Sequence, residues 1–486
     1  MVANLILEWT IMAQSYGQLA KNHVGFWQVL FQSVSQMGPG LSAVSGLTAA
    51  ASFAAGAMPL AIILALIASL LGANTLIQFA KKISSAGGYY AFVAHGSGPR
   101  MGIFTGWIYL LYQGINAPAM ILFFGFLLRS VLDMGLGMNL PRWTWWPFAL
   151  AAAGFVWYIS YKGIKPSLRY SMVAGLIEFV VFVILGTVLV EKAGPHNTFA
   201  PFLPASSPRG WAGVGMAMVF GLFSFAGYGA AAPLGEEAKN PKKTISRAVF
   251  LAVLIVGIYY VFIGYASTVG WGLNKMSSYA SLPLPLMTMA QKDLGPLWFW
   301  LVAILVINGT LACITAIHNA QVRVLYALGR DRLVVPERLG QTHAVHRSPF
   351  QAIHFQSVIN ILVVSLVGFW LGSFAGFVFL GELMTLSTLM VHIFANFSLT
   401  RYYKRLGEFR VLVHGIIPAL ATVLYLFPIY FTVYPVPNFP DNIPPYVVGA
   451  WIIMGGILLV RIFKQSPDRI QNAGLITGDT SEEITG

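Results

Sequence analysis

The chain has 486 residues, of which 57% are hydrophobic and only 9% are charged. Soluble domains carry roughly 25% charged residues, so this composition excludes a soluble protein and predicts an all-α, polytopic membrane protein. The formal net charge is +13, and the single cysteine, Cys313, excludes an intramolecular disulfide and a paired-cysteine metal site.

Apolar stretches of about 20 residues, long enough to cross a bilayer, recur along the chain. Twelve are expected, at about 25–53, 56–79, 101–132, 145–161, 169–190, 211–234, 245–270, 296–328, 352–371, 374–399, 411–433 and 444–463. Residues 1–22 lack the features of a secretory signal and are expected to form a cytoplasmic tail or an interfacial helix. The remainder divides into 23–193 (helices 1–5), 194–402 (helices 6–10), 403–465 (helices 11 and 12) and a cytoplasmic tail, 466–486.

The basic residues indicate the orientation. With the N-terminus inside, 23 of the 29 Lys and Arg residues fall in cytoplasmic segments, as the positive-inside rule predicts. The positive charge therefore reports topology in a cell membrane, with both termini cytoplasmic, and nucleic-acid binding is not expected.

Two of the twelve stretches are expected to break inside the membrane. Helix 1 contains Gly38-Pro39-Gly40, and helix 6 contains Phe225-Ala226-Gly227-Tyr228-Gly229 followed by Pro233. Gly and Pro destabilise a helix by about 1 and 3 kcal/mol respectively. Helices 1 and 6 are five apart, so two five-helix units of opposite orientation would bring the breaks to corresponding positions. Paired breaks of this kind favour an inverted-repeat transporter over two kinked packing helices.

The break in helix 1 offers backbone donors. Pro39 has no N–H, so the groups at Gly40, Leu41 and Ser42 are the candidates to bind a carboxylate, with the Ser42 hydroxyl as an additional donor. On its own, Ser42 would be read as a packing residue. The substrate-binding candidates here are Met37, Gly38, Gly40, Leu41 and Ser42.

The break in helix 6 offers acceptors. The carbonyl groups of Ser224, Phe225 and Ala226 suit an ammonium group, and the two breaks together describe a receptor for a zwitterion such as an α-amino acid. Phe223, one turn before the break, is the favoured cap over the substrate, and Tyr228 flanks the break on its other side.

Two polar residues of helix 3, Gln113 and Asn116, are three apart and share one face. We expect them to line the same pocket. The pocket is small, aromatic and mostly uncharged, which favours a neutral amino acid.

Glu178 is an ionisable residue within helix 5, and such residues are functional candidates by default. Burial disfavours its charged form, so we interpret it as a proton-coupling group; the alternative is a structural carboxyl held neutral by a neighbouring helix. His318 in helix 8 is a second proton-coupling candidate, although a lone membrane histidine is more often a packing residue.

The sequence contains no motif typical of nucleotide binding or of a zinc protease. No phosphate-binding loop is present, and the loop 329–347 lacks the His-Glu-x-x-His pattern of a zinc protease. We therefore expect no enzyme activity, no cofactor and no metal. An intramembrane enzyme would need a catalytic constellation at one depth, and an ion channel would not need two broken helices.

Several motifs resemble the amino acid–polyamine–organocation superfamily of permeases. The most specific is Phe225-Ala-Gly-Tyr228 followed by Glu236-Glu-Ala-Lys-Asn-Pro-Lys-Lys243. In addition, Ser84-Ser-Ala-Gly-Gly-Tyr-Tyr90 resembles the helix 2–3 region of that family, and the stretch from Asn319 to Asp331 resembles the end of its helix 8. The resemblance covers about residues 22–465.

The resemblance implies ten helices in a 5+5 inverted repeat, with helices 1 and 6 broken, and two additional helices. It also implies substrate held between helices 1 and 6 and alternating access driven by an ion gradient. Some relatives have a lysine where this chain has Glu178. The helix 8 positions that carry paired hydroxyls in sodium-coupled members look here like Ala316-Ile317, which favours protons. An amine, polyamine or amino acid exchanger on the same fold is the alternative, and neither the substrate nor the oligomeric state follows from the sequence.

Overall fold

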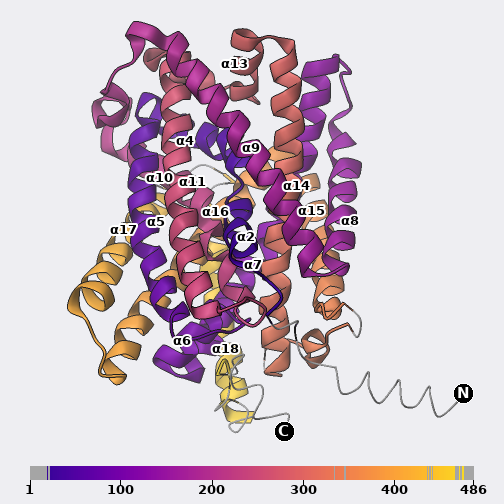
Figure 1. Ribbon diagram of the computed structural model, residues 1–486, viewed down its shortest axis with the longest axis vertical. Coiled ribbons are helices and arrows are strands. Elements are labelled where there is room, and N and C mark those ends of the chain that lie inside the picture. The colour runs from indigo at the N-terminus through magenta and orange to yellow at the C-terminus, as the bar shows by residue number, and fades with distance from the viewer. Residues whose placement is uncertain are drawn as a thin grey trace, which may run out of the picture.

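The computed structural model describes residues 19, 22–332, 334–343, 346–434, 436, 439–440, 442–465, 470 and 473–475. Over these residues the chain is α-helical, and its paired extended backbone is limited to an isolated parallel bridge between Val24 and Ala238. The expected tails 1–22 and 466–486 lie outside the described residues apart from the few positions given above. Figure 1 shows long helices running side by side, with α2 near the middle of the bundle.

The chain is built from helices of very different length. They are α2 (Phe26–Met37), α3 (Pro39–Val44), α4 (Gly46–Ala54), α5 (Met58–Ala80), α6 (Tyr89–Ser97), α7 (Pro99–Leu136), α8 (Trp145–Tyr161), α9 (Ile164–Ala193), α10 (Gly210–Phe225), α11 (Pro241–Trp271), α12 (Met276–Ala280), α13 (Pro285–Leu294), α14 (Pro296–Arg330), α15 (Phe350–Leu371), α16 (Ser373–Arg405), α17 (Ile417–Val433) and α18 (Pro444–Gln465). Two further helices matter below: the 3₁₀-helix η6 (Ala226–Leu234) and the π-helix η9 (Leu412–Ile416).

Within the described residues, ten helical stretches are long and apolar enough to cross a membrane. The expected span 25–53 is not among them as a single helix, because it is divided into α2, α3 and α4, and only the α4 part continues into α5. The expected span 145–161 corresponds to α8, which has 17 residues. The structure thus confirms a multi-span helical protein, while the total of twelve spans and the inverted repeat remain predictions.

The predicted break in helix 1 is present. Gly38 ends α2 in the left-handed conformation, with φ 58° and ψ 71°, which glycine adopts without the steric penalty of a Cβ. Pro39 is the first residue of α3, a position where its missing N–H and fixed φ are tolerated. Gly-Pro therefore stops one helix and starts the next.

The predicted break in helix 6 is also present. The α-helix α10 ends at Phe225 and the chain continues as η6, a 3₁₀-helix of 9 residues. Runs of 3₁₀-helix longer than three or four residues are uncommon. Two glycines, Gly227 and Gly229, and Pro233 lie within it, and each weakens the α-helical alternative.

Small residues let the helices approach closely. Helix α16 packs along α7, and α11 along α5, while α10 packs on both α4 and α5. At Gly221 of α10, a Cβ would lie 2.7 Å from the Cβ of Ala65 on α5. Because lipid is as apolar as a leucine side chain, helices in a bilayer associate through such close packing. The outcome is a tight bundle around α2, α3 and η6.

Candidate functional site

The breaks in helices 1 and 6 lie against each other. A Cβ at Gly227 in η6 would be 2.5 Å from the carbonyl carbon of Gln36 and 2.6 Å from the backbone nitrogen of Met37. Only glycine permits two backbones to approach this closely. The two breaks are therefore neighbours in space.

Tyrosines from neighbouring helices hydrogen-bond the carbonyl groups at the breaks. The Tyr260 hydroxyl on α11 donates to the carbonyl oxygen of Met37 at 2.6 Å and lies 3.3 Å from that of Ser224, so it bridges both breaks. The Tyr112 hydroxyl on α7 donates to the Ala226 carbonyl at 3.0 Å. Irregular backbone at membrane depth requires partners of this kind.

Ser42 is engaged within its own segment. Its hydroxyl donates to the Met37 carbonyl at 2.9 Å, and its backbone N–H donates to the Gly38 carbonyl at 2.7 Å. Leu41, like Ser42, is buried in α3. Of the three donors expected at this break, Gly40 is the one that a charged side chain contacts.

That side chain is Glu178 on α9, whose carboxyl group lies between Gly40 on α3 and Gly309 on α14. A Cβ at either glycine would overlap it, and the one at Gly40 would be 2.6 Å from Cδ. The Gly40 backbone N–H interacts with the carboxyl group, whereas Oε1 has no hydrogen-bond partner among the described residues. Glu178 is 1% exposed. The chain's own carboxyl group thus reaches the position where the sequence predicts a substrate carboxylate.

Two further buried oxygens near the breaks, Gln36 Oε1 and Gln113 Oε1, also lack hydrogen-bond partners in the described part of the chain. The side chains of Gln36 and Asn116 lie beside the Tyr112 hydroxyl, and Gln113 lies beside Tyr109. The structure therefore brings Asn116 beside the tyrosine that binds η6, whereas Gln113 lies beside Tyr109. Amide oxygens are acceptors, so a ligand with N–H donors would satisfy these atoms.

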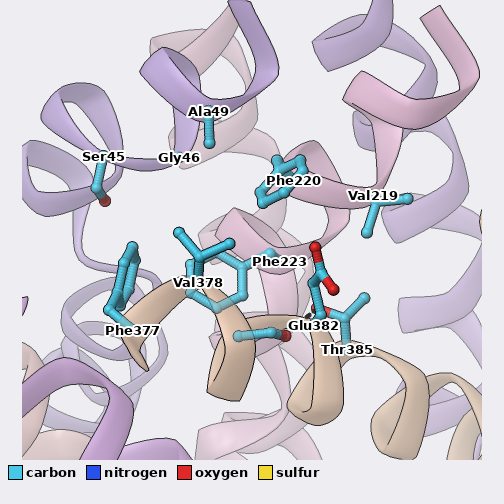
Figure 2. Close-up of a pocket in the computed structure, with 11 residues that line it drawn as sticks. Ser45, Gly46, Ala49, Val219, Phe220, Phe223, Phe377, Val378, Glu382 and Thr385 are labelled. Carbon is cyan, nitrogen blue, oxygen red and sulfur yellow. Dashed lines mark hydrogen bonds between the residues drawn. The ribbon is translucent and has the colours of Figure 1, made fainter. Parts of the chain in front are cut away.

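A small pocket with a volume of only about 10 Å³ lies between α4, α10 and α16. Figure 2 shows that Phe220, Phe223 and Phe377 line it together with Glu382. The Phe223 ring packs edge-to-face on Phe377, with centroids 5.6 Å apart, and a Cβ at Gly381 would lie 2.9 Å from it. Phe223 is two residues before the end of α10, so a residue next to the helix 6 break lines this pocket, called the outer pocket below.

His318 lies elsewhere in the bundle. Its Nδ1 is 3.4 Å from Nδ2 of Asn360 on α15, and nine residues, about 14 Å of helix rise, separate it from Gly309. The structure therefore does not bring the two proton-coupling candidates, Glu178 and His318, together. The described residues also contain no group of three or more His, Cys, Asp or Glu side chains that could hold a metal ion.

The other ends of both broken helices are tied to α14. The Val24 backbone N–H donates to the Glu237 carbonyl at 3.0 Å, which joins the start of α2 to the turn after η6. The Glu237 carboxylate forms a buried ion pair with Arg323, and Glu236 pairs with Arg330 at 3.0 Å. The family-like Glu236-Glu237 pair thus fixes both helices at this end.

Tyr260 is a site residue that the sequence reasoning missed. Its signal is weak, because the chain has 20 tyrosines and helix 7 alone contains three of them, Tyr259, Tyr260 and Tyr265. Only the adjacent pair Tyr259-Tyr260 in the middle of that helix marked the position.

Comparisons with known proteins show the family of the chain. The chain matches the amino acid permease family over residues 28–469. It is 27% identical over 372 residues to the branched-chain amino acid permease BcaP of Bacillus subtilis (strain 168), covering 74% of this chain and 77% of the relative. It is 24% identical over 404 residues to BcaP of Lactococcus lactis subsp. cremoris (strain MG1363), covering 78% and 82%.

A third relative is the low-affinity putrescine importer PlaP of Escherichia coli (strain K12), 28% identical over 338 residues and covering 66% of this chain and 69% of the relative. All three are transporters and not enzymes. The family match includes both breaks, Glu178 and the residues that pair with α14. The chain therefore belongs to the amino acid permease family of membrane transporters.

Proposed function

We propose that the protein is a proton-coupled secondary active transporter of amino acids. Substrate binds where the broken helices meet and is released by alternating access. The observation that carries this proposal is the contact of the Glu178 carboxyl group with Gly40 inside the helix 1 break. That contact supports the proposal because it puts a titratable group next to the backbone donor proposed to bind the substrate.

Glu178 and a substrate carboxylate compete for the same donor. Two carboxylates at one site cannot both remain charged without strong repulsion. When an amino acid places its carboxylate at Gly40, Glu178 takes up a proton and becomes neutral. One proton would thereby accompany each substrate, which is the physical basis of coupling.

The substrate ammonium group would bind on the η6 side. The Ala226 carbonyl accepts one hydrogen bond from Tyr112, and the Ser224 carbonyl lies 3.3 Å from the Tyr260 hydroxyl, which donates to Met37. Both carbonyl oxygens have a lone pair left, because each has two. The buried oxygens of Gln36 and Gln113 supply further acceptors. Three N–H donors of an ammonium group fit this set of acceptors.

The side chain of the substrate would point towards the outer pocket. Its aromatic lining of Phe220, Phe223 and Phe377 favours an apolar side chain, because burial of apolar area is the main source of affinity there. The two relatives described as branched-chain amino acid permeases support this choice.

Alternating access would use the contacts at both ends. Movement of Phe223 away from Gly381 opens the path from the outer pocket to the breaks. Separation of the Glu237–Arg323 and Glu236–Arg330 pairs releases the other ends of α2 and η6. On the predicted orientation these pairs close the cytoplasmic side.

Uptake into proteoliposomes tests the proposal directly. Leucine, isoleucine and valine are offered under an inward proton gradient, under a sodium gradient and with neither. Uptake that requires the proton gradient supports the proposal. Uptake driven only by sodium would refute proton coupling, and transport that occurs only against preloaded amino acid would identify an exchanger.

A second candidate is the transport of amines. Glu382 lines the outer pocket among the aromatic side chains, and a carboxylate among aromatic rings suits a second ammonium group. The similarity to a putrescine importer agrees with this. Competition with leucine uptake distinguishes the two candidates. Amine binding is supported if excess putrescine blocks leucine uptake and Glu382→Gln removes this block. Amine binding is excluded if putrescine does not compete.

A further inference from the structure

A second cavity, away from the broken helices, lies at the end of α5 where it meets the connection between α16 and α17. Its volume is about 620 Å³. It contains none of the residues assigned above to substrate or proton binding. On the predicted orientation it lies at the cytoplasmic surface of the membrane.

The charged residues lining this cavity are predominantly basic. Lys81, Lys82 and Arg410 supply three positive charges, and Glu408 is the one carboxylate among the described lining residues. Lys82 pairs with Glu408 at 2.8 Å. Lys81 and Arg410 are therefore the cations that a ligand would meet, and they select an anion.

Hydrogen bonds fix the walls of the cavity to one another. Asn74 Nδ2 on α5 donates to the Val413 carbonyl in η9 at 2.8 Å. The Tyr403 hydroxyl on α16 donates to the Gln78 carbonyl at 3.0 Å. Lys81 Nζ lies 3.3 Å from Gln78 Oε1, so one cation is already oriented along the wall. Three helices thus build the cavity together.

A buried histidine completes the polar lining. His414 is 3% exposed, and its ring stacks on Tyr403 with centroids 3.6 Å apart. Its Nδ1 accepts a hydrogen bond from the Arg410 backbone N–H at 3.1 Å, so the proton of a neutral ring is on Nε2. The ring therefore offers the cavity a donor, as the cations do.

The surface next to the cavity is apolar and uncovered. Leu412 and Ile416 in η9 and Leu420 on α17 are 60%, 47% and 50% exposed, and α17 lies at the edge of the bundle beside α5 (Figure 1). In a membrane protein such a face contacts lipid chains. A basic cavity directly adjoining a lipid-facing helix matches the two parts of a phospholipid.

We propose that this cavity binds the phosphate group of an anionic glycerophospholipid, whose acyl chains lie along η9 and α17. Basic pockets between membrane helices on the cytoplasmic side bind anionic headgroups in this way. The phosphate contacts Lys81, Arg410 and His414, and the lipid holds α17 against α5. Because α5 continues the chain of the broken helix 1, this lipid stabilises the helix that leads out of the substrate site.

Thermal unfolding of the full-length protein in detergent tests the site without any transport measurement. Phosphatidylglycerol is added in one series, phosphatidylcholine in a second, and soluble glycerol 3-phosphate and inorganic phosphate in a third and fourth. A saturable stabilisation by phosphatidylglycerol alone is expected. Equal stabilisation by soluble phosphates would overturn the lipid assignment, and equal stabilisation by phosphatidylcholine would overturn recognition of the charge.

Substitutions locate the effect. Lys81→Gln and Arg410→Gln each remove a charge-assisted contact and are expected to weaken the apparent affinity for phosphatidylglycerol by about tenfold or more. Arg401→Gln, an exposed cation of α16 outside the lining, is the matched control and should leave the affinity unchanged. If Arg401→Gln and Lys81→Gln lose the same amount of affinity for phosphatidylglycerol, the lipid responds to the overall surface charge, and the proposed site is refuted.

Two further variants are expected to strengthen or retain lipid binding, which a folding defect would not do. Glu408→Gln frees Lys82 and removes the one repulsive charge, so it is expected to raise the apparent affinity for phosphatidylglycerol. Lys81→Arg keeps the charge and should retain the response. A weaker response in Glu408→Gln than in the unmodified protein would contradict the proposal.

Discussion

The carboxyl group of Glu178 on α9 rests against Gly40 at the start of α3, and no Cβ would fit between them. Gly309 on α14 leaves the same carboxyl group room on its other side. Three helices that are distant in sequence therefore converge on one ionisable group. The following predictions examine this group and its surroundings.

Glu178→Gln is expected to uncouple transport from protons. The amide retains nearly the same volume and polar character but cannot release a proton, so uptake should lose its stimulation by an inward proton gradient. Initial rates of leucine uptake with and without the gradient measure this. If uptake by Glu178→Gln is unimpaired and still depends on the proton gradient, Glu178 is not the proton-coupling group.

Gly40→Ala and Gly309→Ala are expected to destabilise the protein by about 1–3 kcal/mol each, because the added methyl group overpacks the site of the carboxyl group. Thermal unfolding in detergent measures the effect. Gly154→Ala on α8 is the matched control, since no atom lies within 4 Å of its added Cβ. Combining Gly309→Ala with Glu178→Ala should relieve the overlap, so that the two effects are not additive.

Tyr260→Phe is expected to destabilise the junction of the breaks by about 0.5–1.5 kcal/mol, because the buried Met37 carbonyl loses one of its two hydrogen-bond donors and keeps the Ser42 hydroxyl. Tyr259→Phe is the matched control on the preceding residue. Its buried hydroxyl has no partner among the described residues, so its removal should be neutral or stabilising. Equal losses in the two variants would contradict the assigned role of Tyr260.

Glu237→Gln is expected to cost about 3–5 kcal/mol, because it leaves the Arg323 charge buried without its partner. Replacing both residues should be less harmful than the sum of the single changes, and a double-mutant cycle by thermal unfolding measures the coupling. The exposed pair Arg332–Glu337, at 2.7 Å, serves as control and should contribute about 0–1 kcal/mol. A coupling of similar size at both pairs would contradict this account.

Phe223→Ala is expected to raise the KM for leucine by about tenfold, because the loss of a buried aromatic contact of 1–3 kcal/mol corresponds to such a factor. Phe397→Ala, a substitution at a 65% exposed position of α16, should leave KM unchanged. If Phe397→Ala raises KM by the same factor, the effect of Phe223→Ala reflects a general loss of structure and not the loss of a cap over the substrate.

Several features could be predicted from the sequence because they depend on local covalent constraints. Glycine at 38 and proline at 39 restrict the backbone wherever they lie, so the end of α2 and the start of α3 were predictable. The same holds for the change from α10 to η6 after Phe225. Helix boundaries elsewhere were close to prediction, although α6, α12 and α13 were not foreseen because they are short segments in the connections.

The contacts of the site were harder to predict. Ser42, expected to bind substrate, donates its hydroxyl to Met37, and His318, expected to accompany Glu178, faces Asn360. The His318 partner is 42 residues away, and the Ser42 bond depends on how the chain turns at the break, although Met37 is only five residues away. The importance of Tyr260 was missed for the same reason, since its partners belong to two other helices.

The sequence by itself determined that the chain spans a membrane many times, where its two central helices break and which residue types surround them. Only the tertiary structure decided that the breaks touch, that Glu178 reaches Gly40 and that Tyr260 bridges both breaks. The physical reason is that these helices are apolar on nearly every face, so hydrophobic periodicity does not reveal which side points inward. The rotation of each helix is fixed by close packing with its neighbours, and that packing exists only in the folded bundle.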